Sequence, residues 1–452
     1  MRATTTRIRA IGKCKSLNGP TRRGKKEWVD ICNRGDGYTH SSRKRWALLT
    51  KLGASQPSRK VGSVAASDIA NLLFRTSNIK PQKSEKIEAR KELSELLNLC
   101  EEKMALMKDF TGEEVLNALK SVKNGKAAGT DGVLPEFLKN LGPRSINWIA
   151  TLATNIVNSN NIPNTWRESK VIAILKPNKE PTDPKNYRPI SLLLSKYKLF
   201  ERMILARLQS TIEASLPIEQ AGFRKNRNCC DQALALATHI ENWFQRQQKS
   251  GAVFLDLYSA YDTVWKKGLI LKLAKILKCR TTVRLIDNIL SNRKFRVSFS
   301  GKESHYKRLQ NGLSQGSVPS PQLFNAYIAD ITETSSRKFM YEDDVALVTQ
   351  ARSFAELENM LNADLDKLQK YFHKWHLTLN PGKSVTRTFH LNNRETKKEL
   401  EILITGKKIA TEDCPKYLEV KFDRTLTYSH YLESVKNKLK TRNNIIAKLA
   451  GT

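Results

Sequence analysis

The sequence has few cysteines, and their spacing suggests no metal site. It contains seven cysteines in 452 residues. Their number is odd, none belongs to a Cys-x-x-Cys pair, and no histidine stands at the spacing of a zinc ligand. We interpret them as small buried or free thiols of a protein in a reducing compartment. A disulfide-rich scaffold and a structural zinc cluster are therefore not expected.

Long apolar runs are also missing. The longest, from Trp148 to Val157, is too short and too polar to span a bilayer. The first residues, which include Arg2, Arg7 and Arg9, lack the apolar segment of a secretion signal. We therefore expect no membrane partner and a location inside the cell, in the nucleus, the cytoplasm or both.

Acidic residues are scarce relative to basic ones. Lysine and arginine number 78 against 44 aspartates and glutamates, so the formal net charge is +34. Such an excess indicates a polyanionic partner.

Apolar residues make up 40% of the chain, enough for substantial cores, and the length suggests two to four domains. The first fifty residues are strongly basic, and we expect either an arm that grips nucleic acid phosphates or a solvated linker.

Apolar periodicity predicts several helices. The clearest begins at a capping box formed by Ser353 and Glu356 and continues as an amphipathic pattern to Trp375. Its apolar stripe is more consistent with core packing than with a cofactor site. Another pattern, in which Leu234 and Ile240 are expected to pack, covers residues 229–248. Further helical patterns cover residues 65–74, 89–107 and 428–449.

Three stretches have the character of β-strands. Residues 170–175 form a short run rich in β-branched side chains. In residues 251–257, alternation predicts one face in the core and an opposite face that presents Asp256. Residues 338–341 and 345–348 predict a hairpin with acidic residues at its turn.

Carboxylates at these strand ends are the candidates for chemistry. Mg²⁺ prefers oxygen ligands and keeps waters and substrate phosphates in its shell, so two or three aspartates are sufficient. Two such ions roughly 3.5–4 Å apart can promote an in-line displacement at phosphorus. An Asp-Asp pair alone is weak evidence, because most such pairs are solvated turns. Gly382-Lys-Ser384 is similar to the end of a P-loop, but Leu377 stands where that motif needs glycine, so we reject an NTPase.

Eight short segments, taken together and in order, resemble the reverse transcriptase of non-LTR retrotransposons, especially the jockey-like group. The resemblance covers roughly residues 110–440. The segments are Gly129-Thr-Asp-Gly132, Ile174-Leu-Lys-Pro177, Tyr187-Arg-Pro-Ile-Ser-Leu192, Gln220-Ala-Gly-Phe-Arg224, Phe254-Leu-Asp-Leu257 with Ala260-Tyr-Asp262, Ser314-Gln-Gly-Ser317, Tyr341-Glu-Asp-Asp344 and Asn380-Pro-Gly-Lys383.

This resemblance implies an α/β (α+β) right-hand polymerase with palm, fingers and a partial helical thumb. We expect a basic arm and helical linker in residues 1–110, and fingers and palm in residues 111–395. Residues 396–452 would hold the primer-grip region and the start of the thumb. The endonuclease of autonomous relatives has no counterpart in the sequence, so the resemblance also suggests a truncated reading frame.

The resemblance further implies roles for individual residues. The aspartates Asp256, Asp343 and Asp344 match the family's ligands for two Mg²⁺ ions, with Mn²⁺ as a possible substitute. Five residues match positions around the incoming nucleotide: Lys176, Arg188, Tyr261, Gln315 and Lys383. The first two would hold the triphosphate. The tyrosine would exclude a ribose 2′-hydroxyl, or simply pack in the core.

The last two residues of this set would act on the template side and on the leaving group. Gln315 resembles the residue that positions the nucleotide and the template base. Lys383 is a candidate acid for the pyrophosphate that leaves. Alone, each cation would be an ordinary surface charge.

Three positions depart from the family pattern. Glu342 stands where relatives have alanine and adds a like charge beside the aspartates, unless strand alternation turns it away. Ser314 replaces a proline. Glu419 replaces a glycine in the primer grip, where close backbone approach favours a residue without a side chain.

Three functions follow as hypotheses. The first is an RNA-directed DNA polymerase whose partners are an RNA template, a DNA primer or target and deoxynucleoside triphosphates. The second is a decayed remnant that only binds nucleic acid. The third, an RNA-templated RNA polymerase, is disfavoured by Tyr261 and by the eight-segment resemblance. Protein partners are not predicted.

Overall fold

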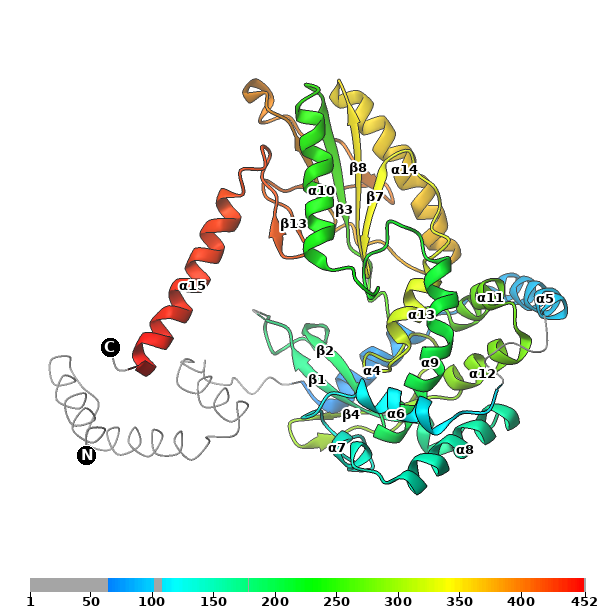
Figure 1. Ribbon diagram of the computed structural model, residues 1–452. Helices are drawn as coiled ribbons and strands as arrows, with labels where there is room; N and C mark the ends of the chain where they lie inside the picture. The colour runs from blue at the N-terminus through cyan, green and yellow to red at the C-terminus, as the bar shows by residue number, and fades with distance from the viewer. Residues whose placement is uncertain (1–63, 101–107, 178, 451–452) are drawn as a thin grey trace, which may run out of the picture. The chain divides into compact units, whose positions relative to one another are not determined.

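The computed structural model describes residues 64–100, 108–177 and 179–450. The predicted basic arm and the end of the 89–107 helical pattern lie outside these residues. The chain has a mixed α/β fold and divides into two units, residues 63–430 and a second unit of which residues 431–450 are described. Figure 1 shows the elements with their labels.

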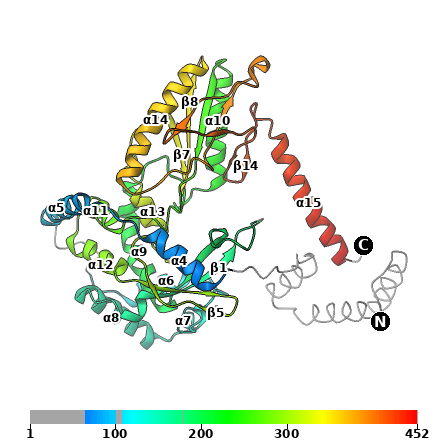
Figure 2. The same cartoon turned by 180° about the vertical axis from the view of Figure 1, so that it is seen from behind.

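The first sheet has five strands, with the order β2-β1-β4-β5 and β6 paired to β4. Strand β1 runs antiparallel to β2 and parallel to β4. Helix α4 packs on this sheet, as Figure 2 shows from behind. The elements are α4 (Ala66–Ser77), β1 (Glu168–Leu175), β2 (Tyr187–Leu192), β4 (Lys294–Phe299), β5 (Lys302–Glu303) and β6 (Lys307–Arg308). The strand predicted at residues 170–175 is confirmed as β1.

The second sheet also has five strands, with the order β12-β9-β3-β8-β7. Its central strand β3 is antiparallel to both β8 and β9. The strands are β3 (Lys249–Leu255), β7 (Arg337–Tyr341), β8 (Asp344–Ala351), β9 (Val385–Phe389) and β12 (Ala410–Thr411). The acidic hairpin predicted around residue 343 is confirmed as β7 and β8.

Helices cover both faces of the second sheet: α10 (Cys229–Phe244) on one side and α14 (Phe354–Lys374) on the other (Figure 1). Phe254 packs with α10, whereas Val253 and Leu255 belong to the cluster that includes α14. The half-buried strand predicted here is therefore wrong: β3 is buried on both faces, and Asp256 follows its end. Leu234, expected to pack, is 65% exposed on α10.

Helix α14 begins where the sequence predicts. The Ser353 hydroxyl accepts a hydrogen bond from the backbone nitrogen of Glu356 at 3.2 Å, and the Glu356 side chain completes the capping box. This helix therefore starts from local interactions and is fixed by its apolar stripe on the sheet.

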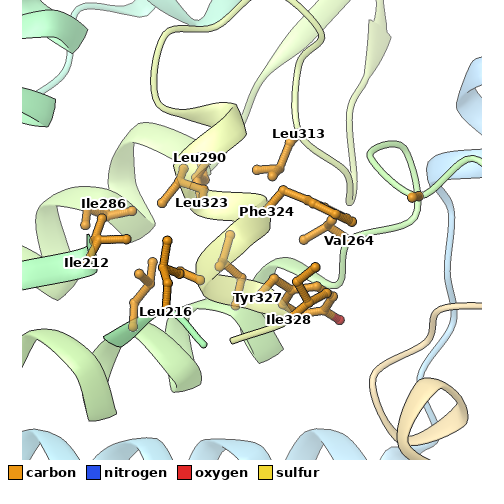
Figure 3. Close-up of a cluster of buried hydrophobic side chains, with 14 of the residues drawn as sticks. Ile212, Leu216, Val264, Ile286, Leu290, Leu313, Leu323, Phe324, Tyr327 and Ile328 are labelled. Carbon is orange, nitrogen blue, oxygen red and sulfur yellow. The ribbon is translucent and has the colours of Figure 1, made fainter. Parts of the chain in front are cut away.

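The remaining helices pack into the same large core that contains the inner face of α14. Their bounds are α5 (Lys83–Leu99), α6 (Gly112–Lys120), α7 (Pro135–Lys139), α8 (Pro143–Ser159), α9 (Ser195–Ser215), α11 (Lys266–Leu277), α12 (Arg280–Leu290) and α13 (Ser320–Tyr327), with short 3₁₀ helices at Asn164–Arg167, Pro184–Asn186 and Asn393–Glu395. Figure 3 shows the centre of this core, where Phe324 and Tyr327 of α13 meet Leu216 after α9 and Leu290 of α12. This core supports the loops between the two sheets.

The C-terminal part contains short strands and one long helix. Its elements are β10 (Leu403–Ile404), β11 (Lys407–Lys408), β13 (Lys416–Tyr417), β14 (Val420–Lys421) and α15 (Ser429–Ala450). The helix predicted at residues 428–449 is confirmed as α15. Within the described residues, no helix combines the length and apolar character needed to cross a membrane.

Candidate active site

Three aspartates meet at one edge of the second sheet. Leu255 of β3 pairs with Val345 of β8, so Asp256 and Asp344, one residue further on, lie at the same edge. Tyr341 pairs with Asp344 across the hairpin, which leaves Glu342 and Asp343 as its turn. The sheet register thus brings together carboxylates that are 87 residues apart in sequence (256 to 343).

The electrostatics of the aspartates confirm that they are neighbours. Burial raises the pKa of Asp343, and the Asp256 carboxylate adds to the rise. Burial, followed by the charges of Asp343 and Asp256, raises the pKa of Asp344 to about 6. Because each carboxylate disfavours ionisation of the others, a cation between them would relieve the repulsion.

The donor set suits a hard divalent cation, because all three groups supply carboxylate oxygens. Across residues 64–100, 108–177 and 179–450, no three histidine, cysteine, aspartate or glutamate side chains are already gathered as a metal-binding cluster. The three aspartates therefore suit Mg²⁺ by the chemistry of their oxygens and by their place at one sheet edge.

The turn at Asn380–Ser384 holds Asp256 in place. The Asn380 amide nitrogen donates to Asp256 Oδ2 at 2.8 Å, and the Asp256 backbone nitrogen donates to the Ser384 hydroxyl at 3.1 Å. The Asn380 backbone nitrogen also donates to the Asp256 carbonyl at 2.8 Å. Asn380 and Ser384 are almost fully buried. Neither residue is among the site residues predicted from the sequence.

A second contact fixes the acidic turn itself. Gln220, fully buried, accepts a hydrogen bond from the Glu342 backbone nitrogen at 3.0 Å and donates to the Glu342 carbonyl at 3.2 Å. Gly222 lies so close that a Cβ there would overlap the Glu342 backbone nitrogen. The motif Gln220-Ala-Gly222 therefore holds the turn, a role that its sequence alone did not reveal.

Glu342 belongs to the carboxylate cluster. Its φ of +59° lies in the left-handed region. Burial, followed by the charges of Asp343 and Asp344, raises the pKa of Glu342 to about 7, against an opposing effect of Arg188. The Glu342 carboxylate therefore interacts electrostatically with the aspartates.

Cations surround the aspartates. Lys383 Nζ lies 3.5 Å from Asp256 Oδ2. Arg188 and Lys383 both act on Asp343 and oppose the rise in its pKa. Lys176 donates to the Lys185 carbonyl at 2.9 Å, and its pKa is lowered by burial and then by the neighbouring charges of Lys383 and Arg188. The three predicted cations thus lie near one another and face the acids.

Tyr261 lies next to the acidic turn. Its ring stacks on Phe324, with centroids 4.7 Å apart and planes 17° apart. Its hydroxyl is buried without a hydrogen-bond partner among the described residues. Burial raises its pKa, and the charges of Glu342 and Asp343 add to the rise. The ring is therefore packed on one side and borders the cluster on another.

Gln315 is held from both sides of its loop. The Ser191 backbone nitrogen donates to its carbonyl at 2.7 Å. Gly316, at φ +124°, would place a Cβ 2.5 Å from the Ser191 carbonyl oxygen, so this position requires glycine. The Gln315 side chain hydrogen-bonds Asp262, whose pKa is raised by burial to about 6 in spite of this bond and of Lys176.

Asp262 is a residue that the sequence analysis did not select. It lies beside Gln315 in one small cavity and interacts with Lys176, so it joins two predicted nucleotide-binding residues. Its place directly after Tyr261 was the available signal. All eight predicted site residues therefore lie in one region between the two sheets.

A basic chain that gathers three carboxylates and a rim of cations has the features of a metal-dependent, phosphate-binding protein. Residues 174–422 match the reverse transcriptase (RNA-dependent DNA polymerase) family. This match covers more than half of the chain, which therefore belongs to the reverse transcriptase family. Membership implies a polymerase fold with palm and fingers.

Several curated relatives are RNA-directed DNA polymerases of mobile elements. The polymerase of mobile element jockey from Drosophila funebris is 30% identical over 75% of this chain and 38% of its own length. The probable polymerase of transposon BS from Drosophila melanogaster is 30% identical over 74% and 38%. A Pol polyprotein of element R2 from Popillia japonica is 24% identical over 61% and 38%. The chain is thus related to jockey polymerases and spans 38% of these relatives' lengths.

Proposed function

We propose that this protein is an RNA-directed DNA polymerase of a non-LTR retrotransposon. The 3′-hydroxyl of a primer would attack the α-phosphate of a deoxynucleoside triphosphate on an RNA template. The observation that carries this proposal is the convergence of Asp256, Asp343 and Asp344 at one sheet edge. In this proposal the second sheet is the palm, the first sheet belongs to the fingers, and α15 begins the thumb.

The three aspartates would hold two Mg²⁺ ions, or Mn²⁺ in their place. Bound there, the ions would lower the pKa of the primer hydroxyl and stabilise the leaving pyrophosphate. The protein's own contribution is position. Asn380 fixes one oxygen of Asp256, and Gln220 fixes the backbone beside Asp343. Preorganised ligands of this kind do not have to reorganise during the reaction.

The surrounding residues would bind and select the nucleotide. Lys176 and Arg188 would hold the triphosphate, the second with a bidentate guanidinium. Lys383, already beside Asp256, would donate a proton to the pyrophosphate. Tyr261, supported by Phe324, would exclude a ribose 2′-hydroxyl. Gln315, oriented by Asp262, would contact the nucleotide and the template base.

Primer extension tests this proposal. On poly(rA) with oligo(dT), Mg²⁺ and dTTP, we expect extension by the wild type and a loss of about 1,000-fold or more in Asp343→Asn, since a metal ligand is removed. The matched control is Asp366→Asn, an exposed aspartate on α14. Equal rates in Asp343→Asn and the control would refute the assigned site.

One observation favours the second hypothesis, a remnant that binds nucleic acid without chemistry. Glu342 adds a negative charge to the cluster, where it competes with Mg²⁺ binding. If this charge is the impairment, Glu342→Ala should raise extension about fivefold at limiting Mg²⁺, which corresponds to ~1 kcal/mol. The exposed Glu88→Ala serves as control. Salt-sensitive duplex binding without extension by either protein would favour the remnant.

A further inference from the structure

A cavity lies away from the proposed active site, between α7, α8 and α9. Its volume is about 420 Å³, and none of the eight predicted site residues lines it. The helices that form it are neighbours in Figure 1. We call it the α8 groove. Its lining residues include Arg144, Trp148 and Leu152 of α8 and Lys196 of α9.

Helix α8 has two apolar stripes, of which one is buried and the other is only partly covered. The first stripe, with Ile146, Ala150 and Val157, is buried against the core. The second, with Trp148 and Leu152 four residues apart, faces the α8 groove. Since a surface helix of a globular protein normally needs a single apolar stripe, the second stripe provides a surface for something else.

Large aromatic side chains are exposed around this groove. Trp148 is 63% exposed and Phe137, on α7, is 66% exposed. Among the described tryptophans, only Trp148 has a mostly exposed side chain. Exposed aromatic residues beside an apolar cavity are typical of the central contacts of protein interfaces.

The charges at the rim of the groove have one sign. The charged residues that line it are Arg144 and Lys196, both exposed. Neither forms an ion pair with any residue in the described part of the chain. Helix α8 contains no acidic residue in its 17 positions. A partner that covers this surface must therefore be acidic at its edges and apolar at its centre.

We propose that the α8 groove binds an acidic amphipathic helix of a partner protein. Apolar side chains at positions i, i+3 or i+4 and i+7 of that helix would enter the cavity beside Trp148 and Leu152. Its carboxylates would pair with Arg144 and Lys196. RNA is a poorer fit, because the lining is a continuous apolar surface with cations only at its rim, whereas nucleic acid grooves place cations along the backbone path.

A displayed peptide library tests the proposal with the full chain. The probe is a set of 16-residue helices with random apolar residues at four positions on one face and glutamate or aspartate elsewhere. Enriched peptides are then synthesised with a fluorescent label, and their affinity is measured by anisotropy. We expect affinity to fall at least tenfold in Trp148→Ser and in Arg144→Glu. A glutamate in the first turn of α8 is favourable for the helix, so Arg144→Glu should not disturb the fold.

Two control variants separate specific binding from attraction to a basic protein. Ile218→Ser removes another exposed apolar side chain, outside the groove, and Lys302→Glu reverses a charge on β5. Affinity in both should equal that of the wild type. The proposal is overturned if the library enriches nothing, or if all four variants change affinity alike. The affinity of labelled oligo(rU) is measured as well. The proposal is also overturned if Trp148→Ser lowers the affinity for oligo(rU) tenfold but does not lower the affinity for any peptide.

Discussion

The two five-stranded sheets differ in how firmly they hold their charged residues. In the second sheet, β3 is buried on both faces, and the acidic residues at its edge are fixed by Asn380, Ser384 and Gln220. In the first sheet, burial alternates along β1, and the exposed Arg188 on β2 extends from the end of a hairpin. The acidic residues are therefore anchored by hydrogen bonds to buried side chains, whereas Arg188 stands exposed near a strand end.

This difference suggests a division of labour. Metal ligands must meet at fixed distances, so their sheet is enclosed and their backbone is anchored. Cations that receive a flexible triphosphate act over longer range and tolerate motion. Changes in the second sheet should therefore reduce the rate of chemistry, and changes in the first sheet should weaken nucleotide binding.

Among the variants that test this difference between the sheets, the largest effect is expected at the contact that fixes the acidic turn. Gly222→Ala introduces a Cβ into the backbone of Glu342 and should displace Asp343. We expect extension at saturating dTTP to fall about 100-fold, the scale of a small displacement of catalytic groups. Binding of the primer–template duplex should not change. Gly142→Ala, which has open space at its Cβ position, is the control. A changed KM with normal kcat would contradict the proposed division of labour between the two sheets.

The next variant tests the selection of the nucleotide sugar by Tyr261. Tyr261→Ala removes the ring that Phe324 supports and should let a 2′-hydroxyl enter. We expect the preference for dTTP over UTP to fall about tenfold or more, the effect of losing one steric contact of 1–3 kcal/mol. Comparing kcat/KM for the two nucleotides measures this preference. Tyr258→Ala, at a half-exposed tyrosine nearby, should leave this preference unchanged. If Tyr261→Ala also leaves the preference unchanged, the role of Tyr261 is core packing.

The smallest effect among these three variants is expected in the first sheet. Arg188→Gln removes one charge-assisted contact to phosphate, worth ~1.5–3 kcal/mol. The KM for dTTP should rise about tenfold or more, and kcat should stay within about twofold. Arg284→Gln, the same change at an exposed site on α12, should alter neither constant. A fall in kcat at constant KM would show that the cations act in the transition state. It would contradict the assignment of nucleotide binding to the first sheet and of chemistry to the second.

Local patterns predicted most elements of the second sheet. The capping box at Ser353 and the acidic hairpin are short-range features, and both are present as predicted. The burial of β3 was missed because its two covering helices come from distant parts of the chain. Alternation along one strand gives no sign of a second covering helix, so it predicts a half-buried strand where both faces are covered.

The site was predictable where residues carry the chemistry and obscure where residues hold others in place. The aspartates and cations stand out by charge at strand ends. Gln220, Asn380 and Asp262 act through contacts with residues tens of positions or more away, or through loops that only the fold brings together. Their role depends on tertiary distances, which spacing along the chain does not encode.

The most direct test of the central claim is where divalent metal binds. With Fe²⁺ in place of Mg²⁺, together with ascorbate and peroxide, hydroxyl radicals cut the backbone close to the bound ion, and mass spectrometry locates the cuts. We predict cuts after β3 and in the β7–β8 turn, suppressed by excess Mg²⁺ and absent in Asp343→Asn. Cuts elsewhere in the chain, or the same cuts in Asp343→Asn, would contradict the assignment of the metal site to this sheet edge.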